Sequence, residues 1–134
     1  MYHKDNPHVQ IGSISLFEFS STNAKIAEAW LGYSLDENFR GKGLMSEALG
    51  KVLGFAFEKL GLQRIKAKVR ISNERSKGVV KRAGFENVGI HRKGKWRADE
   101  EGRIEVIETE VWLLKKEDWE DHVNGRLIDT VASL

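Results

Sequence analysis

The sequence predicts an α/β domain whose sheet contains both antiparallel and parallel strand pairs. Two apolar runs, 9–19 and 25–35, flank the polar turn 20–23, and this pattern predicts an antiparallel hairpin. A strongly periodic helix follows at 44–60, and an alternating strand follows it at 64–71. A strand–helix–strand unit of this spacing favours parallel pairing. The sheet is therefore expected to be mixed.

The composition excludes several classes of protein. At 134 residues, with 40% hydrophobic and 31% charged residues, the chain suits one globular core. It contains no cysteine, so disulfides, thiolate zinc sites and cysteine nucleophiles are excluded. No apolar run approaches membrane-spanning length and no signal peptide is evident, so we expect a cytoplasmic protein that does not bind membranes. No acidic or histidine cluster has metal-ligand spacing, so no metal is expected.

Within the hairpin, Gly12 is a candidate position for a β-bulge. Alternate residues of the second run point to the same side of a strand. One face carries small, aliphatic and aromatic residues, namely Ala27, Ala29, Leu31, Tyr33 and Leu35. The other face carries Ile26, Glu28 and Trp30.

A glycine-rich loop precedes the periodic helix. Gly41 and Gly43 flank Lys42, and Arg40 comes just before them. Main-chain N–H groups at the start of a helix lack partners within it, and the helix dipole makes that end positive. Glycines keep side chains away from those donors, while the two cations add full charge. The loop is predicted to bind a pyrophosphate, although a tight turn before a helix would show the same pattern.

The helix itself is amphipathic. Its apolar face has two neighbouring rows, Leu44, Ala48, Val52, Ala56 and Leu60 in one and Met45, Leu49 and Leu53 in the other. In the strand that follows, Arg64, Lys66, Lys68 and Arg70 alternate with apolar residues. This basic face is either a binding surface or a solvated face with long aliphatic stems. No aromatic residues interleave with its charges, so nucleic-acid binding is not expected.

The rest of the chain is predicted to add a helix and two strands. Asn73 is a suitable N-cap for the helix. Strands are expected near 86–92 and 104–114, joined by an acidic loop. We expect residues 1–120 to form the domain and residues 121–134 to form a tail or a short helix.

Three separated blocks resemble the GCN5-related N-acetyltransferases, the GNAT family. Arg40-Gly41-Lys42-Gly43-Leu44-Met45 resembles the family's acetyl-CoA pyrophosphate loop, with Met45 where Gly or Ala is usual. That variation, together with the block at 30–35 and a third block formed by 73–76 and 82–85, is similar to the ribosomal-protein alanine N-acetyltransferase branch. The resemblance implies the GNAT fold, a mixed, mostly antiparallel sheet with helices on its faces.

The resemblance also implies elements that are absent from this sequence. Family members carry a strand and two helices before the hairpin, so we expect an N-terminally truncated version of the fold. Those helices usually cover one face of the sheet. Either the chain is a fragment, or an exposed apolar patch is covered by another subunit, for example in a homodimer.

The family's chemistry is transfer of an acetyl group from acetyl-CoA to a primary amine. The resemblance assigns the pyrophosphate to the glycine-rich loop and the pantetheine arm to the end of the second run, whose backbone offers strand-like pairing. It assigns Asn73 to the pantetheine arm as well, although an N-cap role explains this residue equally. Lys77 is a candidate for the 3′-phosphate, although an ordinary surface lysine would show the same pattern. The predicted cofactor-binding residues are Tyr33, Ser34, Leu35, Arg40, Gly41, Lys42, Gly43, Leu44, Met45, Asn73, Ser76 and Lys77.

Ser76 and Glu28 are the catalytic candidates. Ser76 matches a position that, in related enzymes, faces the sulfur and donates a proton to it. Glu28 is the candidate base that removes the proton of the amine through water, and His91 is a further option. All three also have structural explanations, as a first-turn serine, an exposed strand glutamate and a surface histidine.

The acceptor is left open between a protein N-terminus, such as that of a ribosomal protein, and a small amine. An acidic stretch at 99–101 is compatible with any cationic acceptor. The alternative to an enzyme is a non-catalytic module that binds acyl-CoA or a partner protein. A P-loop hydrolase is excluded by the glycine spacing, and a dinucleotide-binding dehydrogenase by Ser46, where a third glycine is needed.

Overall fold

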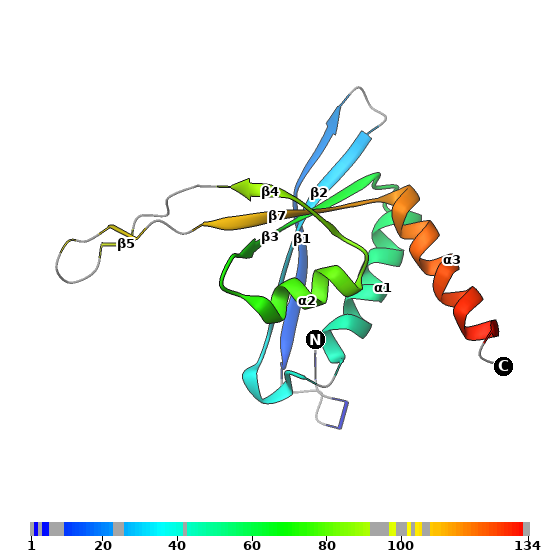
Figure 1. Cartoon of the computed structure of the whole chain (residues 1–134), viewed down its shortest axis with the longest axis horizontal. Coiled ribbons are helices and arrows are strands. Elements are labelled where there is room, and N and C mark those ends of the chain that lie inside the picture. The colour runs from blue at the N-terminus through cyan, green and yellow to red at the C-terminus, as the bar shows by residue number, and fades with distance from the viewer. Residues whose placement is uncertain are drawn as a thin grey trace.

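The computed structural model of the chain describes residues 2, 4–5, 10–22, 26–41, 43–91, 97–98, 102, 104–105 and 108–132. Figure 1 shows a sheet with helices packed alongside it. The elements are β1 (Gly12–Thr22), β2 (Ile26–Leu35), the 3-10 helix η1 (Glu37–Phe39), α1 (Leu44–Glu58), β3 (Arg64–Arg70), α2 (Glu74–Arg82), β4 (Glu86–His91), β5 (Arg97–Ala98), β6 (Ile104–Glu105), β7 (Thr109–Lys115) and α3 (Lys116–Ala132).

The main sheet has the strand order β1-β2-β3-β7-β4. β2 and β3 run parallel, and they are connected through α1. The β1–β2, β3–β7 and β4–β7 pairs are antiparallel. This confirms the mixed, mostly antiparallel sheet, including the hairpin and the strand–helix–strand unit. β5 and β6 form a separate two-stranded sheet beyond the end of β4 (Figure 1).

An apolar core of described residues lies between one face of the sheet and the helices. The predicted inward residues of β2 and β3, such as Ala29 and Ile65, are fully buried in it. The buried face of α1 is centred on Leu49, Leu53 and Phe57. The helix ends at Glu58, two residues before the predicted end, and Leu60 beyond it is 44% exposed. α2 contributes Val79 and Val80, and β7 contributes Trp112 and Leu114.

α3 packs beside α1. The rings of Phe57 in α1 and Trp119 in α3 are stacked with their centroids 5.2 Å apart. His122 bonds through Nε2 to the main-chain oxygen of Arg82 at 3.0 Å, at the end of α2. Of the two structures expected for the C-terminal region, the chain thus forms a helix. That helix, α3, begins at Lys116 and is continuous across residue 120.

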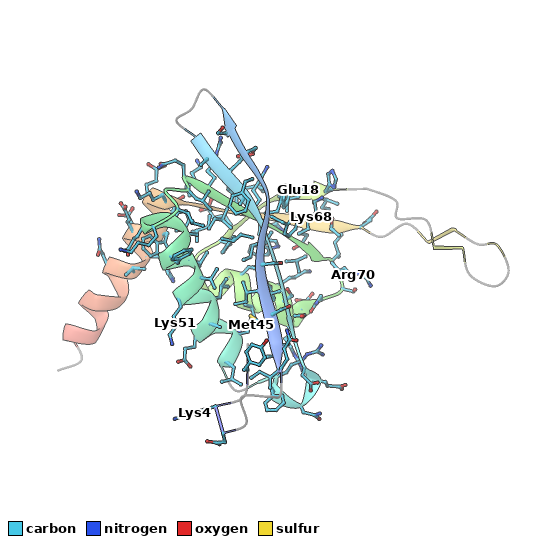
Figure 2. All side chains as sticks on the ribbon, turned by 180° about the vertical axis from the view of Figure 1, so that it is seen from behind. Lys4, Glu18, Met45, Lys51, Lys68 and Arg70 are labelled. Atoms are coloured by element: carbon cyan, nitrogen blue, oxygen red, sulfur yellow. The ribbon has the colours of Figure 1, made fainter. Side chains whose placement is uncertain are left out.

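The opposite face of the sheet carries aromatic and basic side chains. Phe17, which pairs with Trp30, is 43% exposed. The ammonium groups of Lys66 and Lys68 each lie 4.6 Å from the ring centroid of Trp30. Lys68 projects from β3 in the reverse view of Figure 2. An aromatic residue of β2 therefore lies among the charges of β3, an arrangement that inspection of β3 alone did not predict.

Three expectations about the strands are wrong. Ser20, Ser21 and Thr22 were expected in a turn, but they belong to β1 and pair with Glu28, Ala27 and Ile26. The irregularity in β1 lies between Phe17 and Ser20, where Glu18 has φ of +50°, and not at Gly12. Gly12 pairs in register with Leu35, and a Cβ there would collide with the carbonyl oxygen of Ser34. The predicted strand 104–114 is divided into β6 and β7, and the acidic residues 99–101 lie outside the described residues.

Candidate functional site

The site begins where β2 and β3 separate. Their pairing extends from Glu28↔Arg64 to Leu31↔Ala67 and then stops, although β2 continues to Leu35 and β3 to Arg70. On its other side β2 remains paired with β1 as far as Leu35. In the part of the chain that the structure describes, the last residues of β2 therefore present a strand edge on the side of β3.

An open cleft of about 830 Å³ lies beside this strand edge. Its walls come from the end of β2, the loop and first turn of α1, and the start of α2. The lining residues are Tyr33, Ser34, Leu35, Glu37, Arg40, Gly41, Gly43, Leu44, Met45, Ser46, Ser72, Asn73, Glu74, Arg75, Ser76, Val79 and Arg82. Most of the predicted cofactor-binding residues thus line one cavity, although they come from three separate segments of the chain.

The glycine-rich loop has the geometry of an open helix N-terminus. Gly41 and Gly43 have φ of +80° and +72°, in the left-handed region that disfavours any other residue. Gly43 is the N-cap of α1 and contributes no side-chain hydrogen bond, and the first main-chain bond of the helix runs from Glu47 N to Gly43 O. The N–H groups of the first turn, which includes Met45 at the lower end of α1 in Figure 2, therefore have no partner within the helix. An anion is well suited to bind them.

Arg40 is held in place at the same end of the cleft. Its Nε donates to the main-chain oxygen of Leu35 at 3.1 Å. The Asp36 side chain accepts from the N–H of Asn38 at 3.0 Å and fixes the turn η1 between them. Arg40 is thus a positioned cation beside the open helix end. Lys42, the other predicted cation, lies outside the described residues.

The first turn of α2 forms the facing wall. Asn73 is its N-cap, and its Oδ1 accepts from the N–H of Ser76 at 3.1 Å. The predicted cap is therefore confirmed, while its role toward a ligand stays a prediction. Across the cleft, the Tyr33 phenol hydrogen-bonds both the hydroxyl and, at 3.2 Å, the main-chain oxygen of Ser76. Burial raises the pKa of Tyr33, and the Ser76 hydrogen bond partly offsets that rise.

Glu28 is not among the residues that line the cleft. It lies where β2 is still paired with β3, on the sheet face that carries Trp30. Its carboxylate accepts from Lys66 Nζ at 3.1 Å and lies 3.4 Å from Arg64 Nε. The hydrogen bond from Lys66 lowers the pKa of Glu28, which makes it a weaker base. The structure thus places the predicted base in an ion-pair network away from the cavity.

Lys77 and His91 also lie outside the lining. The Lys77 ammonium is 3.1 Å from Glu74 Oε1 and 3.3 Å from Glu110 Oε1, and its hydrogen bond to Glu74 raises the pKa of the lysine. Its charge is therefore paired with two carboxylates, one on α2 and one on β7. His91 ends β4, where its main-chain oxygen accepts from Thr109 Oγ1 at 3.1 Å.

Several lining residues were not predicted from the sequence. Arg75, Val79 and Arg82 follow helical spacing, so they share one face of α2. That periodicity was visible in the sequence and could have identified them once Ser76 was a candidate. Ser46, in the first turn of α1, follows from the same reasoning applied to the loop.

Comparison with known proteins assigns the fold to a family. The model of the Acetyltransferase (GNAT) domain matches residues 1–86, which is more than half of the chain. The chain belongs to the GNAT family. Its mixed sheet, with parallel β2 and β3 diverging beside a glycine-rich helix start, is this family's fold as it occurs here.

Two curated relatives of this GNAT chain illustrate the similarity. It is 42% identical over 83 residues to "Probable N-acetyltransferase YjcK" of Bacillus subtilis (strain 168), a match that covers 62% of this chain and 45% of the relative. It is 36% identical over 73 residues to the "[Ribosomal protein uS5]-alanine N-acetyltransferase" of Escherichia coli (strain K12), covering 51% of this chain and 38% of that protein. The chain thus spans less than half the length of these relatives.

Solved structures agree with the fold. The ribosomal-protein-S5-alanine acetyltransferase from Vibrio fischeri superposes with a TM-score of 0.66 at 26% identity, over 81% of this chain and 56% of that one. A structure described as a probable acetyltransferase gives a TM-score of 0.70 at 28% identity, over 85% of this chain and 60% of the other. The predicted GNAT fold is confirmed, and more than a third of each neighbour lies outside the superposition. Among the described residues, no helix is both long and apolar enough to cross a membrane.

Proposed function

We propose that this chain transfers an acetyl group from acetyl-CoA to a primary amine. The observation that carries the proposal is the cleft between an uncapped helix N-terminus and an unpaired strand edge. The first offers N–H donors to a diphosphate, and the second offers alternating donors and acceptors to an amide-containing arm. Coenzyme A contains both groups, separated along one flexible molecule.

The residues present fit such a ligand. A Cβ built on Gly41 or Gly43 meets no atom within 4 Å, so the space above the loop is open to a phosphate. Arg40 supplies a positioned guanidinium there, and Arg75 and Arg82 add cations to the wall formed by α2. Acetyl-CoA would supply the activated acetyl group. The chain's part is to hold the diphosphate and the arm, and to exclude water from the reacting end.

Ser76 is the group we assign to the leaving sulfur. It lines the cleft in the first turn of α2, and its N–H is held by Asn73. A main-chain N–H from the open edge of β2 would polarise the carbonyl of the thioester. Glu28 lies outside the cavity lining and is ion-paired with Lys66, so we do not assign the removal of the amine proton to it.

For the acceptor, we favour the N-terminal amine of a protein, in the cytoplasm. The support is the similarity to a relative named as a ribosomal-protein alanine N-acetyltransferase, which covers about half of this chain. A small amine is the competing acceptor. A peptide and a diamine differ in length and charge, so a direct comparison of the two distinguishes them.

The test combines binding with turnover. Isothermal titration with CoA measures the first, and thiol release from acetyl-CoA measures the second, using a peptide that begins with alanine. The matched controls are the same peptide with a blocked N-terminus and a short diamine. We expect CoA to bind and thiol to be released only with a free amine, with one acetyl group gained by mass spectrometry. Binding without release for any acceptor would identify a non-catalytic module, and no binding would refute the site.

A further inference from the structure

The Tyr33 phenol and the Ser76 hydroxyl form a side-chain contact across the cleft. Tyr33 belongs to β2 and Ser76 to α2, so the contact joins the two walls of the cavity. The phenol oxygen also lies 3.2 Å from the main-chain oxygen of Ser76. Both residues line the cavity. The family resemblance suggested Tyr33 only for its backbone, and nothing assigns a task to its side chain.

The protons of this pair can be arranged in two ways. In one, Tyr33 donates to the main-chain oxygen of Ser76, and the Ser76 hydroxyl donates to Tyr33, which turns the serine proton away from the cavity. In the other, Tyr33 donates to the Ser76 hydroxyl oxygen, and the serine proton is then free to point into the cavity. Only the second arrangement makes Ser76 a donor to a group bound in the cleft.

Acidity decides what such a donor can do. An aliphatic hydroxyl is a far weaker acid than a thiol, so serine alone is a poor proton source for a departing thiolate. A phenol ordinarily has a pKa of about 10 and a thiol about 8.5, which makes the phenol a much closer match. We propose that Tyr33 is a positioning residue that donates to Ser76, so that Ser76 passes a proton to the leaving sulfur and recovers one from the phenol. This rests on the acetyl transfer proposed above.

The step balances as follows. The amine nitrogen forms a bond to the acetyl carbon, the carbon–sulfur bond breaks, and its electron pair goes to sulfur. Ser76 gives its hydroxyl proton to that sulfur, and Tyr33 gives its phenol proton to Ser76. The acceptor amine releases one proton to solvent, and the phenolate takes one proton from solvent, so the number of protons is conserved. Burial disfavours the charged phenolate, so Tyr33 is protonated at neutral pH before each turnover.

The coupling of the pair can be measured without any turnover. The chain has two tyrosines, and the other, Tyr2, is 65% exposed, so Tyr2→Phe leaves Tyr33 as the only phenol. Absorbance titration of that variant should give a pKa above the ordinary value. Adding Ser76→Ala should raise the pKa further, because it removes the hydrogen bond that lowers it. An unchanged titration after Ser76→Ala would overturn the proposal.

Kinetics then test the relay itself. Tyr33→Phe keeps the ring and should lower kcat roughly 10- to 100-fold, with the Kd for CoA unchanged within about twofold. Tyr2→Phe is the matched control and should leave kcat unchanged. The kcat of the Tyr33→Phe/Ser76→Ala double variant should equal that of Ser76→Ala within about twofold. Tyr33 acts only through Ser76, so once Ser76 is removed the loss of the phenol should have no further effect.

The outcomes separate the two proposals. Wild-type turnover that Tyr33→Phe leaves intact, or additive losses in the double variant, would overturn the relay alone. If Tyr33→Phe lowers kcat and CoA affinity by equal factors, the phenol only supports the shape of the cleft, and the relay is likewise overturned. A third outcome is that Ser76→Ala shifts the pKa of Tyr33 but the wild-type protein releases no thiol with any acceptor. That result would refute acetyl transfer, and the relay with it.

Discussion

The strongest test of the cleft changes one glycine at each end of α1. Gly43 begins the helix with φ of +72°, and Gly61 follows its end with φ of +70°. A Cβ built on either glycine meets no atom within 4 Å. Gly43→Ala and Gly61→Ala therefore impose the same backbone strain without a steric clash. The 15-residue helix separates them by about 22 Å, at 1.5 Å per residue.

The two variants should lose similar stability but differ in binding. Holding alanine in a left-handed conformation costs about 1–2 kcal/mol, so both should unfold at similarly lower denaturant concentrations. Only the Cβ at Gly43 lies where a diphosphate would approach the first-turn N–H groups. Loss of one charge-assisted hydrogen bond costs about 1.5–3 kcal/mol, which weakens the Kd for CoA roughly 10- to 150-fold.

Isothermal titration of CoA into both variants, with urea denaturation of each, gives the four numbers required. Gly61→Ala should bind CoA within about twofold of the wild type. Equal affinity of Gly43→Ala and Gly61→Ala would show that the start of α1 does not hold the phosphates. The inference from the open helix end would then be wrong.

Three further predictions follow from contacts described above. Asn73→Ala should lower the free energy of unfolding by about 1 kcal/mol through loss of the α2 cap, and a simultaneous loss of CoA affinity in titration would indicate a ligand role as well. Glu28→Gln should leave thiol release within about twofold and cost about 1 kcal/mol or less, measured by denaturation above pH 5. Since the folded pKa of Glu28 is below 4.5, its contribution is present above that pH and is lost as pH falls through the folded value, so the two proteins should converge in acid. Trp119→Ala should cost about 2–3 kcal/mol by removing the stack on Phe57, and an unchanged denaturation midpoint would contradict the packing of α3.

Much of the fold followed from local sequence signals. The alternation in β3 and the glycines around α1 act over a few residues, so pattern and propensity determine them. The bulge was predicted at Gly12 because an isolated glycine in a strand often marks one. Glycine is required there for another reason: the carbonyl oxygen of Ser34, on the neighbouring strand, leaves no room for a Cβ. The local sequence does not show this contact. The division of the last predicted strand into β6 and β7 is likewise absent from the alternation of apolar residues.

The site was predicted best where main chain forms it. The glycine spacing and the Asn73 cap predicted two walls of the cleft. Two residues chosen for their side chains, Lys77 and Glu28, lie outside the cavity lining. Lys77 could have been paired with Glu74 from their spacing on α2, whereas Glu110 approaches from a strand more than thirty residues later. Glu28 was placed on the correct face of β2, with Trp30, but the sequence did not reveal that Lys66 and Arg64 bind it there.

The separation of β2 from β3 has a consequence for how this surface can change. Peptide groups at 32–35 and 43–46 are identical whatever side chains they carry, provided that glycine occupies the two left-handed positions. Under the proposed function, substitutions around the cavity can therefore alter which amine binds, while main-chain groups continue to bind coenzyme A. A scaffold of this kind can acquire new acceptors with few simultaneous mutations.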